Sequence, residues 1–268
     1  MKLQDIRSKY TESFDFLQAR KRRQVQQLVL LNNLNRGDQN ISSTLLLTLF
    51  NRILSALYDD KMQIKFLPSQ GIMQKQLNSY NSLAQSDYLE MGKAKLDYDW
   101  TWDALFFGRG YLETLRFNKK RKIIEPSVIN PLVFGYDPYF ENPQEWRYYW
   151  KWITKSKWEL EKLIKAGVID GIKDLREIET GIETYLWDYK IKRDEAKKAT
   201  PSPSDAQAGD VYQILEFFGY DKKGNKVVAW VDKGFSKKLF QMKLDLEDGD
   251  EIVAPDGQSI ETDSKWPI

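Results

Sequence analysis

The stretch WTWDALFFGRGYLETLRFN, Trp100–Asn118, changes its hydrophobic period near its middle. Up to Leu105 the apolar residues continue a helical spacing, and from Tyr111 they alternate with a period of two, which is typical of a strand. The Gly108-Arg109-Gly110 step between them predicts a turn that ends the helix. The stretch therefore predicts an α+β fold, in which long amphipathic helices are joined to small antiparallel sheets and hairpins.

The sequence before this stretch is predominantly helical in pattern. Residues 2–34 carry apolar side chains at helical spacing, and a second helix is expected from Ser42 or Ser43, as the N-cap, to residue 58. A short strand is expected at 62–67. From Leu77 to Leu105 the apolar stripe recurs at steps of three to five residues, which predicts a single helix of about eight turns.

The sequence after Asn118 alternates strand and helix signals. Ser156 and Glu159 match a capping box, and Gly167 is expected to end the helix that they open. The other expected elements are a hairpin of 111–117 with 122–128, a strand at 146–153, a helix at 172–192, a hairpin of 211–220 with 226–232 and a strand within 235–244.

These elements divide the chain into four expected segments. A helical segment with a short strand covers 1–70, and a core with the long helix, a hairpin and the aromatic strand covers 71–193. Residues 194–210, DEAKKATPSPSDAQAGD from 194, have no apolar period and two prolines, so we expect a flexible linker or loop there. A β-rich segment covers 211–268.

The composition excludes several chemistries. The chain has no Cys and no His, so it holds no disulfide, no zinc finger, no cysteine nucleophile and no Ser-His-Asp triad. The longest apolar stretch, Leu45–Tyr58, is shorter than the ~20 residues of a spanning helix, so we expect no membrane partner. The net charge of +2 is polarised: Met1–Arg36 has eight basic and three acidic residues, whereas Gln241–Ile268 has two and eight.

The candidate catalytic and metal-binding motifs are weak. Gly108–Gly110 follow a helix, whereas a phosphate loop precedes one. The acidic run from Asp245 lacks the ligand spacing of a calcium loop. Asp97, Asp99 and Asp103 resemble a carboxylate cluster, but with no second acidic motif we interpret them as solvated helix charges. We therefore expect no enzymatic activity, catalytic residue, cofactor or metal.

Two basic clusters are candidates for contact with nucleic acid or capsid protein. They consist of Arg20, Lys21, Arg22 and Arg23, and of Lys119, Lys120, Arg121 and Lys122. Adjacent cations neutralise phosphates without reading sequence. The alternative is a solvated helix face for the first cluster and an exposed turn for the second.

The aromatic run WRYYWKW, 146–152, is the candidate subunit interface, through Trp146, Tyr148, Trp150 and Trp152. Dense aromatic strands are found in permanent interfaces and in protein cores. A stacking platform for bases or sugars is a further alternative.

Several stretches together resemble the wing region of tailed-bacteriophage portal (head–tail connector) proteins. WTWDALFFGRGYLETLRFN is similar to the portal helix that ends in a Gly–x–Gly step before a strand and a polar hairpin. INPLVFGYDPYFENPQEWRYY, 129–149, resembles the portal loop before an Asp-Pro turn, and WITKSKWELEKLI, 152–164, resembles the strand-to-helix step that follows. ISSTLLLTLFNRILSALYDDKMQIKFLPS, from Ile41, is similar to an early portal helix and strand.

The resemblance implies a structural protein of the virion. Portal subunits form closed homo-oligomeric rings, typically dodecamers, at one capsid vertex and pass double-stranded DNA during packaging and ejection without sequence preference. Their expected partners are the major capsid or scaffold protein, the large terminase and head–tail adaptor proteins, with assembly in the host cytoplasm. Portals continue into a stem and clip, so we expect the chain to be truncated at Ile268. The alternative is a nonviral nucleic-acid- or carbohydrate-binding α+β module.

Overall fold

The computed structural model describes residues 1–35, 41–57, 74–90, 92–113, 117–118, 123–124, 126–178, 211–243, 252–253 and 259–260. Its α-helices are α1 (Leu3–Asn35), α2 (Ile41–Leu57), α3 (Gln74–Glu90), α4 (Lys93–Phe107) and α5 (Lys157–Lys165). Short 3-10 turns are η1 (Pro131–Val133), η2 (Pro143–Glu145) and η3 (Leu175–Glu177). The fold is α+β, as the sequence predicts.

The central sheet contains five antiparallel strands in the order β5-β6-β7-β8-β9. Their bounds are β5 (Phe134–Tyr136), β6 (Tyr149–Ser156), β7 (Val211–Tyr220), β8 (Lys226–Asp232) and β9 (Lys238–Lys243). β6 and β7 pair along their length, from Tyr149 opposite Phe218 to Ser156 opposite Val211. The predicted segments 71–193 and 211–268 thus share one sheet, so the boundary between them does not separate folding units.

Two smaller sheets extend from the body. β1 (Tyr111–Glu113) pairs with β4 (Ser127–Ile129), and β2 (Phe117–Asn118) pairs with β3 (Ile123–Ile124), as expected for the predicted hairpin. β11 (Ser259–Ile260) joins β2 to β10 (Ile252–Val253).

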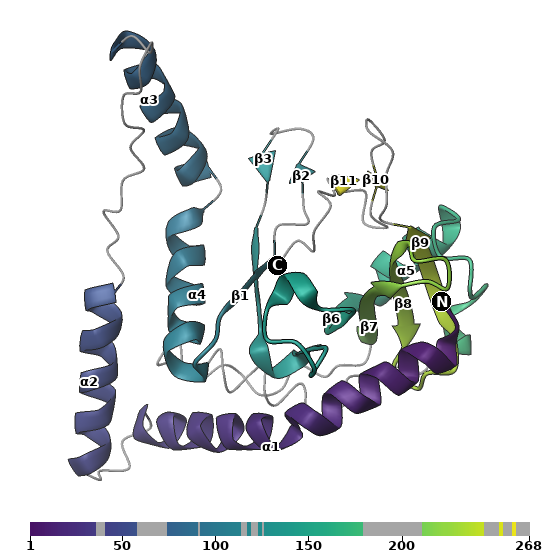
Figure 1. The fold of residues 1–268 in the computed structure, drawn as a ribbon, viewed down its shortest axis with the longest axis horizontal. Coiled ribbons are helices and arrows are strands. Elements are labelled where there is room, and N and C mark those ends of the chain that lie inside the picture. The colour runs from purple at the N-terminus through teal and green to yellow at the C-terminus, as the bar shows by residue number, and fades with distance from the viewer. Residues whose placement is uncertain are drawn as a thin grey trace.

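Both faces of the central sheet are buried, each by its own hydrophobic cluster. The side chains of β6 alternate between these two clusters. Trp150 and Trp152 point to the face that the first half of α1 covers, where Ile6 and Tyr10 pack against them. Tyr149 points to the other face, which α5 and the turns after it cover. α1 runs along the sheet and continues past it to the helices at the opposite side of the molecule (Figure 1).

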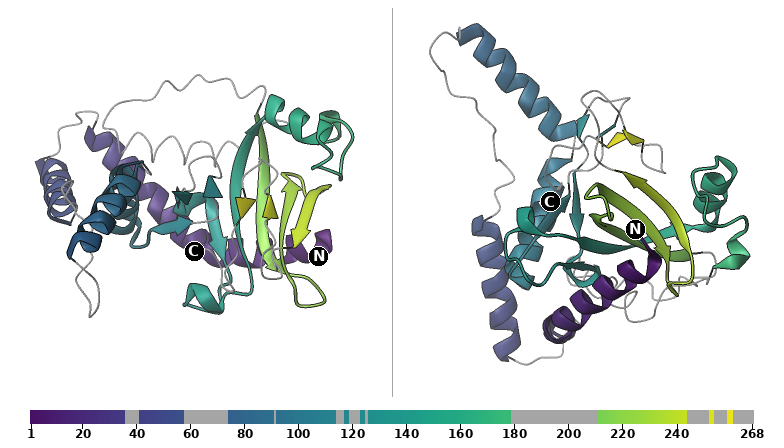
Figure 2. Two further views of the ribbon diagram at one scale, coloured as in Figure 1. Left: turned by 90° about the horizontal axis from the view of Figure 1, so that it is seen from above. Right: turned by 45° about the vertical axis from the view of Figure 1, so that its right-hand side comes forward.

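The helices α2, α3 and α4 form an arm beside the sheet, and α3 projects away from the body (Figures 1 and 2). The single helix predicted from Leu77 to Leu105 is wrong, because Gly92 adopts φ 60° and separates α3 from α4. A left-handed residue interrupts the ladder of helical hydrogen bonds. The small cluster that joins the arm to α1 contains Leu28, Leu54 and Trp102.

The local stop and start signals are confirmed. Gly108 and Gly167 have φ of 74° and 70° and follow α4 and α5, so Gly108 is a helix stop. Ser156 and Glu159 form both bonds of the capping box. Within 172–178 the predicted helix is only the turn η3; the rest of it, the strand at 62–67 and the linker at 194–210 lie outside the described residues.

No helix in the part of the chain that the structure describes is long and apolar enough to cross a membrane.

Candidate functional site

The basic run of 20–23 lies at the middle of α1, and its members have different environments. Arg22 and Arg23 are exposed, and Arg20 is half-buried and donates to the carbonyl oxygen of Phe107 at 3.3 Å. Lys21 is only 7% exposed. The prediction that Lys21 contacts nucleic acid or capsid protein is therefore wrong, because the helix turns its side chain toward the sheet.

The second basic cluster, Lys119 to Lys122, lies outside the described residues. Its role in binding nucleic acid or capsid protein stays a prediction.

The aromatic run is core, not surface. Trp146, Tyr148 and Trp150 are each 1% exposed and Trp152 is 8% exposed. Since β6 lies inside the sheet with both faces covered, these side chains have almost no surface left for a neighbouring subunit. The prediction that Trp146, Tyr148, Trp150 and Trp152 form the subunit interface is wrong, and the same burial rules out a stacking platform for bases or sugars.

The central sheet also buries a group of three charges. The Lys151 ammonium on β6 pairs with Glu113 on β1 and, at 2.8 Å, with Glu216 on β7. The Trp230 indole donates to Glu216 at 2.9 Å. Burial alone would lower the pKa of Lys151, but the two carboxylates raise it above its ordinary value. A lysine that is held charged in this way ties the β1–β4 ribbon to the sheet and is a poor general base.

Two of the three aspartates of α4, Asp97 and Asp103, are buried rather than solvated, contrary to their interpretation from sequence. Asp97 is buried, pairs with Lys93 and accepts from the Tyr88 hydroxyl at 3.1 Å, which bridges α4 to α3. Asp103 is fully buried, and Asp99 is half-buried. Within the described residues, no three His, Cys, Asp or Glu side chains gather as they would around a metal ion.

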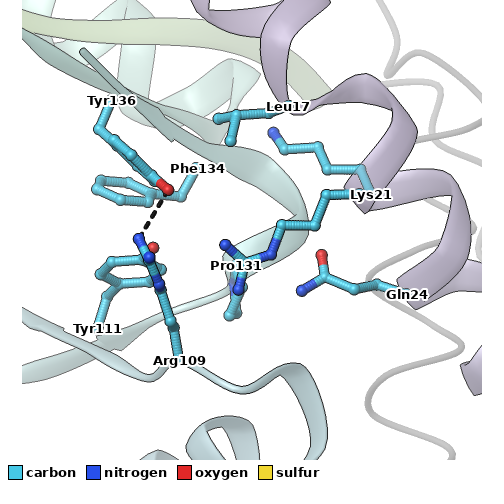
Figure 3. A pocket seen from close by; sticks show the side chains of 9 residues that line it. Leu17, Lys21, Gln24, Arg109, Tyr111, Pro131, Phe134 and Tyr136 are labelled. Atoms are coloured by element: carbon cyan, nitrogen blue, oxygen red, sulfur yellow. Dashed lines mark hydrogen bonds between the residues drawn. The ribbon is translucent and has the colours of Figure 1, made fainter. Parts of the chain in front are cut away.

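A small cavity lies where α1 crosses β5. Its volume is about 20 Å³, and it is partly open. The residues that line it are Leu17, Arg20, Lys21, Gln24, Arg109, Tyr111, Pro131, Phe134 and Tyr136. Figure 3 shows Lys21 and Gln24 reaching from α1 toward the strands, with Arg109 and Tyr136 on the other side.

Hydrogen bonds fix most polar groups around this cavity. Arg109 donates to the Tyr136 hydroxyl at 2.9 Å, and Gln24 donates to the carbonyl oxygen of Phe107 at 3.2 Å. Burial raises the pKa of Tyr111, so this hydroxyl stays protonated. Gln24 and Tyr136 were not singled out from the sequence, and Arg109 was noted only within the Gly108–Gly110 turn, because no local motif connects the three residues.

Lys21 is the exception among these groups. Its ammonium lies 4.5 Å from the centre of the Trp150 ring and has no hydrogen-bond acceptor among the described residues. Burial lowers its pKa from 10.5 to about 7. A buried amine without an acceptor is energetically costly.

A second hollow of about 370 Å³ opens on the outer surface, between the first half of α1 and the loop before β6. The Arg147 guanidinium donates two hydrogen bonds, of 2.6 and 3.1 Å, to the Asp137 carboxylate. The Glu12 carboxylate accepts from the hydroxyls of Tyr139 and Tyr148 at 2.6 and 3.2 Å. Burial alone would raise the pKa of Asp137, but the bonds from Arg147 hold it below its ordinary value. These pairs fix the Asp-Pro turn against α1.

A search of known protein families found no family that matches the chain, and no curated protein is significantly similar to it.

Proposed function

We propose that this chain is a structural subunit of a tailed-phage portal ring. The order of motifs that resembles the portal wing supports this proposal, since the described parts of the motifs within 100–164 lie on elements of the type that the resemblance implies. The helix stop at Gly108, the β1–β4 ribbon, strand β6 and the capped helix α5 follow one another in that order.

The observation that carries the proposal is an exposed apolar stripe on α2. Leu49, Ile53 and Leu57 are spaced four residues apart and are 54%, 39% and 62% exposed. The neighbouring face of α2 packs on the body through Leu54 and through Phe50, whose ring centre lies 5.7 Å from that of Trp102. An apolar stripe of this kind is typical of a surface that a protein partner covers.

In the proposed ring, this partner is a second copy of the chain. A closed ring repeats one heterologous contact, in which a surface of each subunit meets a different surface of the next. The aromatic run of β6 is buried and cannot supply either surface, whereas the α2 stripe is open. Capsid protein, terminase, adaptor proteins and double-stranded DNA are the further partners of the proposed subunit, at the portal vertex of the virion.

The proposed role requires rigidity rather than catalysis. The charges that the central sheet buries on β1, β6 and β7 are paired with one another, which suits a scaffold. Arg22 and Arg23, which are exposed on α1, are candidates for contact with DNA or capsid protein, and the second basic cluster, Lys119 to Lys122, stays a candidate too.

Mass photometry of the full-length protein tests the proposal, with Ile53→Lys as the variant and Asn51→Lys, an exposed polar position on the same helix, as the control. We expect ring-sized particles for the wild type and for Asn51→Lys, and monomers for Ile53→Lys. Wild-type protein that stays monomeric over a wide concentration range would contradict the ring. Rings of Ile53→Lys would instead remove α2 from the interface.

A further inference from the structure

The cavity between α1 and β5 is strongly cationic. Two of its lining residues, Arg20 and Arg109, are positively charged, a third, Lys21, is positively charged when it is protonated, and none of the nine lining residues is acidic. Cations that gather in a partly buried space repel each other more strongly than they do in water. Such a cavity is therefore stabilised by a negative charge inside it.

The two arginines beside the cavity have more N–H donors than their hydrogen bonds within the protein use. Each guanidinium has five N–H groups. Arg20 donates to the carbonyl oxygen of Phe107, and Arg109 donates to the hydroxyl of Tyr136, so both retain further donors. These bonds also hold the two guanidinium groups in place, which lowers the entropy cost of binding a ligand.

Lys21 gives the second, independent indication. It is more than nine-tenths buried, and its ammonium has a ring on one side and no acceptor among the described residues. The lowered pKa of Lys21 reflects burial alone, with no contribution from an acidic side chain of the protein. An anion in the cavity would supply this missing stabilisation.

We propose that the α1–β5 cavity binds a small inorganic anion of about the size of chloride. The volume of about 20 Å³ exceeds the roughly 10–15 Å³ that a single water needs, and it suits one monatomic ion rather than an extended ligand. The anion links α1 to the start of β1 and to β5. This site is independent of the proposed ring function.

Thermal unfolding in sodium chloride and in sodium gluconate, at equal ionic strength and pH 6.5, tests this site. A ligand that binds only the folded chain raises the unfolding temperature. We expect chloride to raise it by at least about 2 °C over gluconate. Lys21→Met should lose this difference, whereas Arg22→Met, an exposed neighbour on α1 that does not line the cavity, should keep it.

Wild-type crystals soaked in bromide give a second test, which does not require a variant to fold. We expect an anomalous peak in the cavity, within contact of Lys21 or the two arginines. Electron density in the cavity that is explained by a water molecule and carries no anomalous signal from bromide would overturn the proposal. So would an unfolding temperature that is equal in the two salts, or a chloride effect that survives in Lys21→Met.

Discussion

The central sheet and the helical arm use apolar side chains in opposite ways. The sheet buries its large aromatics on both faces, and their rings stack on one another, as Tyr136 does on Trp146 at 4.5 Å. The arm leaves large apolar residues in solvent on α2 and α3, among them Leu57 and Leu83. The chain itself therefore covers the aromatic side chains of the sheet, whereas it leaves apolar side chains of the arm exposed.

Truncating a core aromatic side chain should lower the stability more than any other change considered below. Trp146→Ala removes a buried ring and its hydrogen bond to the carbonyl oxygen of Phe140, so we expect a loss of about 3–5 kcal/mol in the free energy of unfolding. Leu57→Ala on the arm should change it by less than about 0.5 kcal/mol. Urea denaturation of the monomer measures both variants, and equal losses would end the comparison.

The next effect concerns the buried amine between the two regions. The pKa of Lys21 is lowered from 10.5 to about 7, so folding favours the neutral amine. The wild-type stability therefore rises as the pH rises from about 7 to about 10.5, and the full cost of burial is present below pH 7. We expect Lys21→Met to stabilise the chain by about 1–4 kcal/mol at pH 6.5.

This gain should shrink as the pH approaches 10.5, because the wild-type lysine is then neutral in both the folded and unfolded states. Urea denaturation at several pH values, in a buffer without halide, measures the trend. Arg22→Met is the control and should show no such trend. A gain that grows with pH would contradict the assigned burial of the charged amine.

The burial of Lys21 could have been predicted from the sequence. Leu17, Lys21, Gln24 and Leu28 follow helical spacing and are all buried on α1. Periodicity thus assigns Lys21 to the buried face, but the run of four cations suggested a solvated face instead. Charge composition and helical phase disagreed at this residue, and the phase decided its environment.

Other features depend on contacts between distant segments. Hairpins, capping boxes and helix stops are local, and the sequence predicted them because their signals lie within a few residues. Whether Trp150 faces a core or a neighbouring subunit depends on α1, more than 100 residues earlier in the chain. The break at Gly92 was missed because one glycine within an apolar stripe is also compatible with a continuous helix.

A smaller loss of stability is expected when alanine replaces either of two glycines, and the space around each glycine determines its size. Gly135 on β5 lies opposite Trp150 on β6, and an added Cβ would overlap with the indole ring. We expect Gly135→Ala to cost about 1–3 kcal/mol because the ring must move within a packed core. Gly167 has φ 70° and no atom within 4 Å of an added Cβ, so Gly167→Ala should cost only about 1 kcal/mol, from backbone strain. Thermal denaturation ranks the two variants.

The smallest expected effect on stability belongs to the exposed cations of α1. Arg22→Gln with Arg23→Gln should leave the free energy of unfolding within about 0.5 kcal/mol of the wild type, since neither side chain is buried. If these residues touch DNA in the assembled protein, each lost phosphate contact lowers the slope of log affinity against log salt by about 0.9. Fluorescence anisotropy with a double-stranded oligonucleotide measures this slope. An unchanged slope would assign the DNA contact to other residues and leave Arg22 and Arg23 to a protein partner or to solvent.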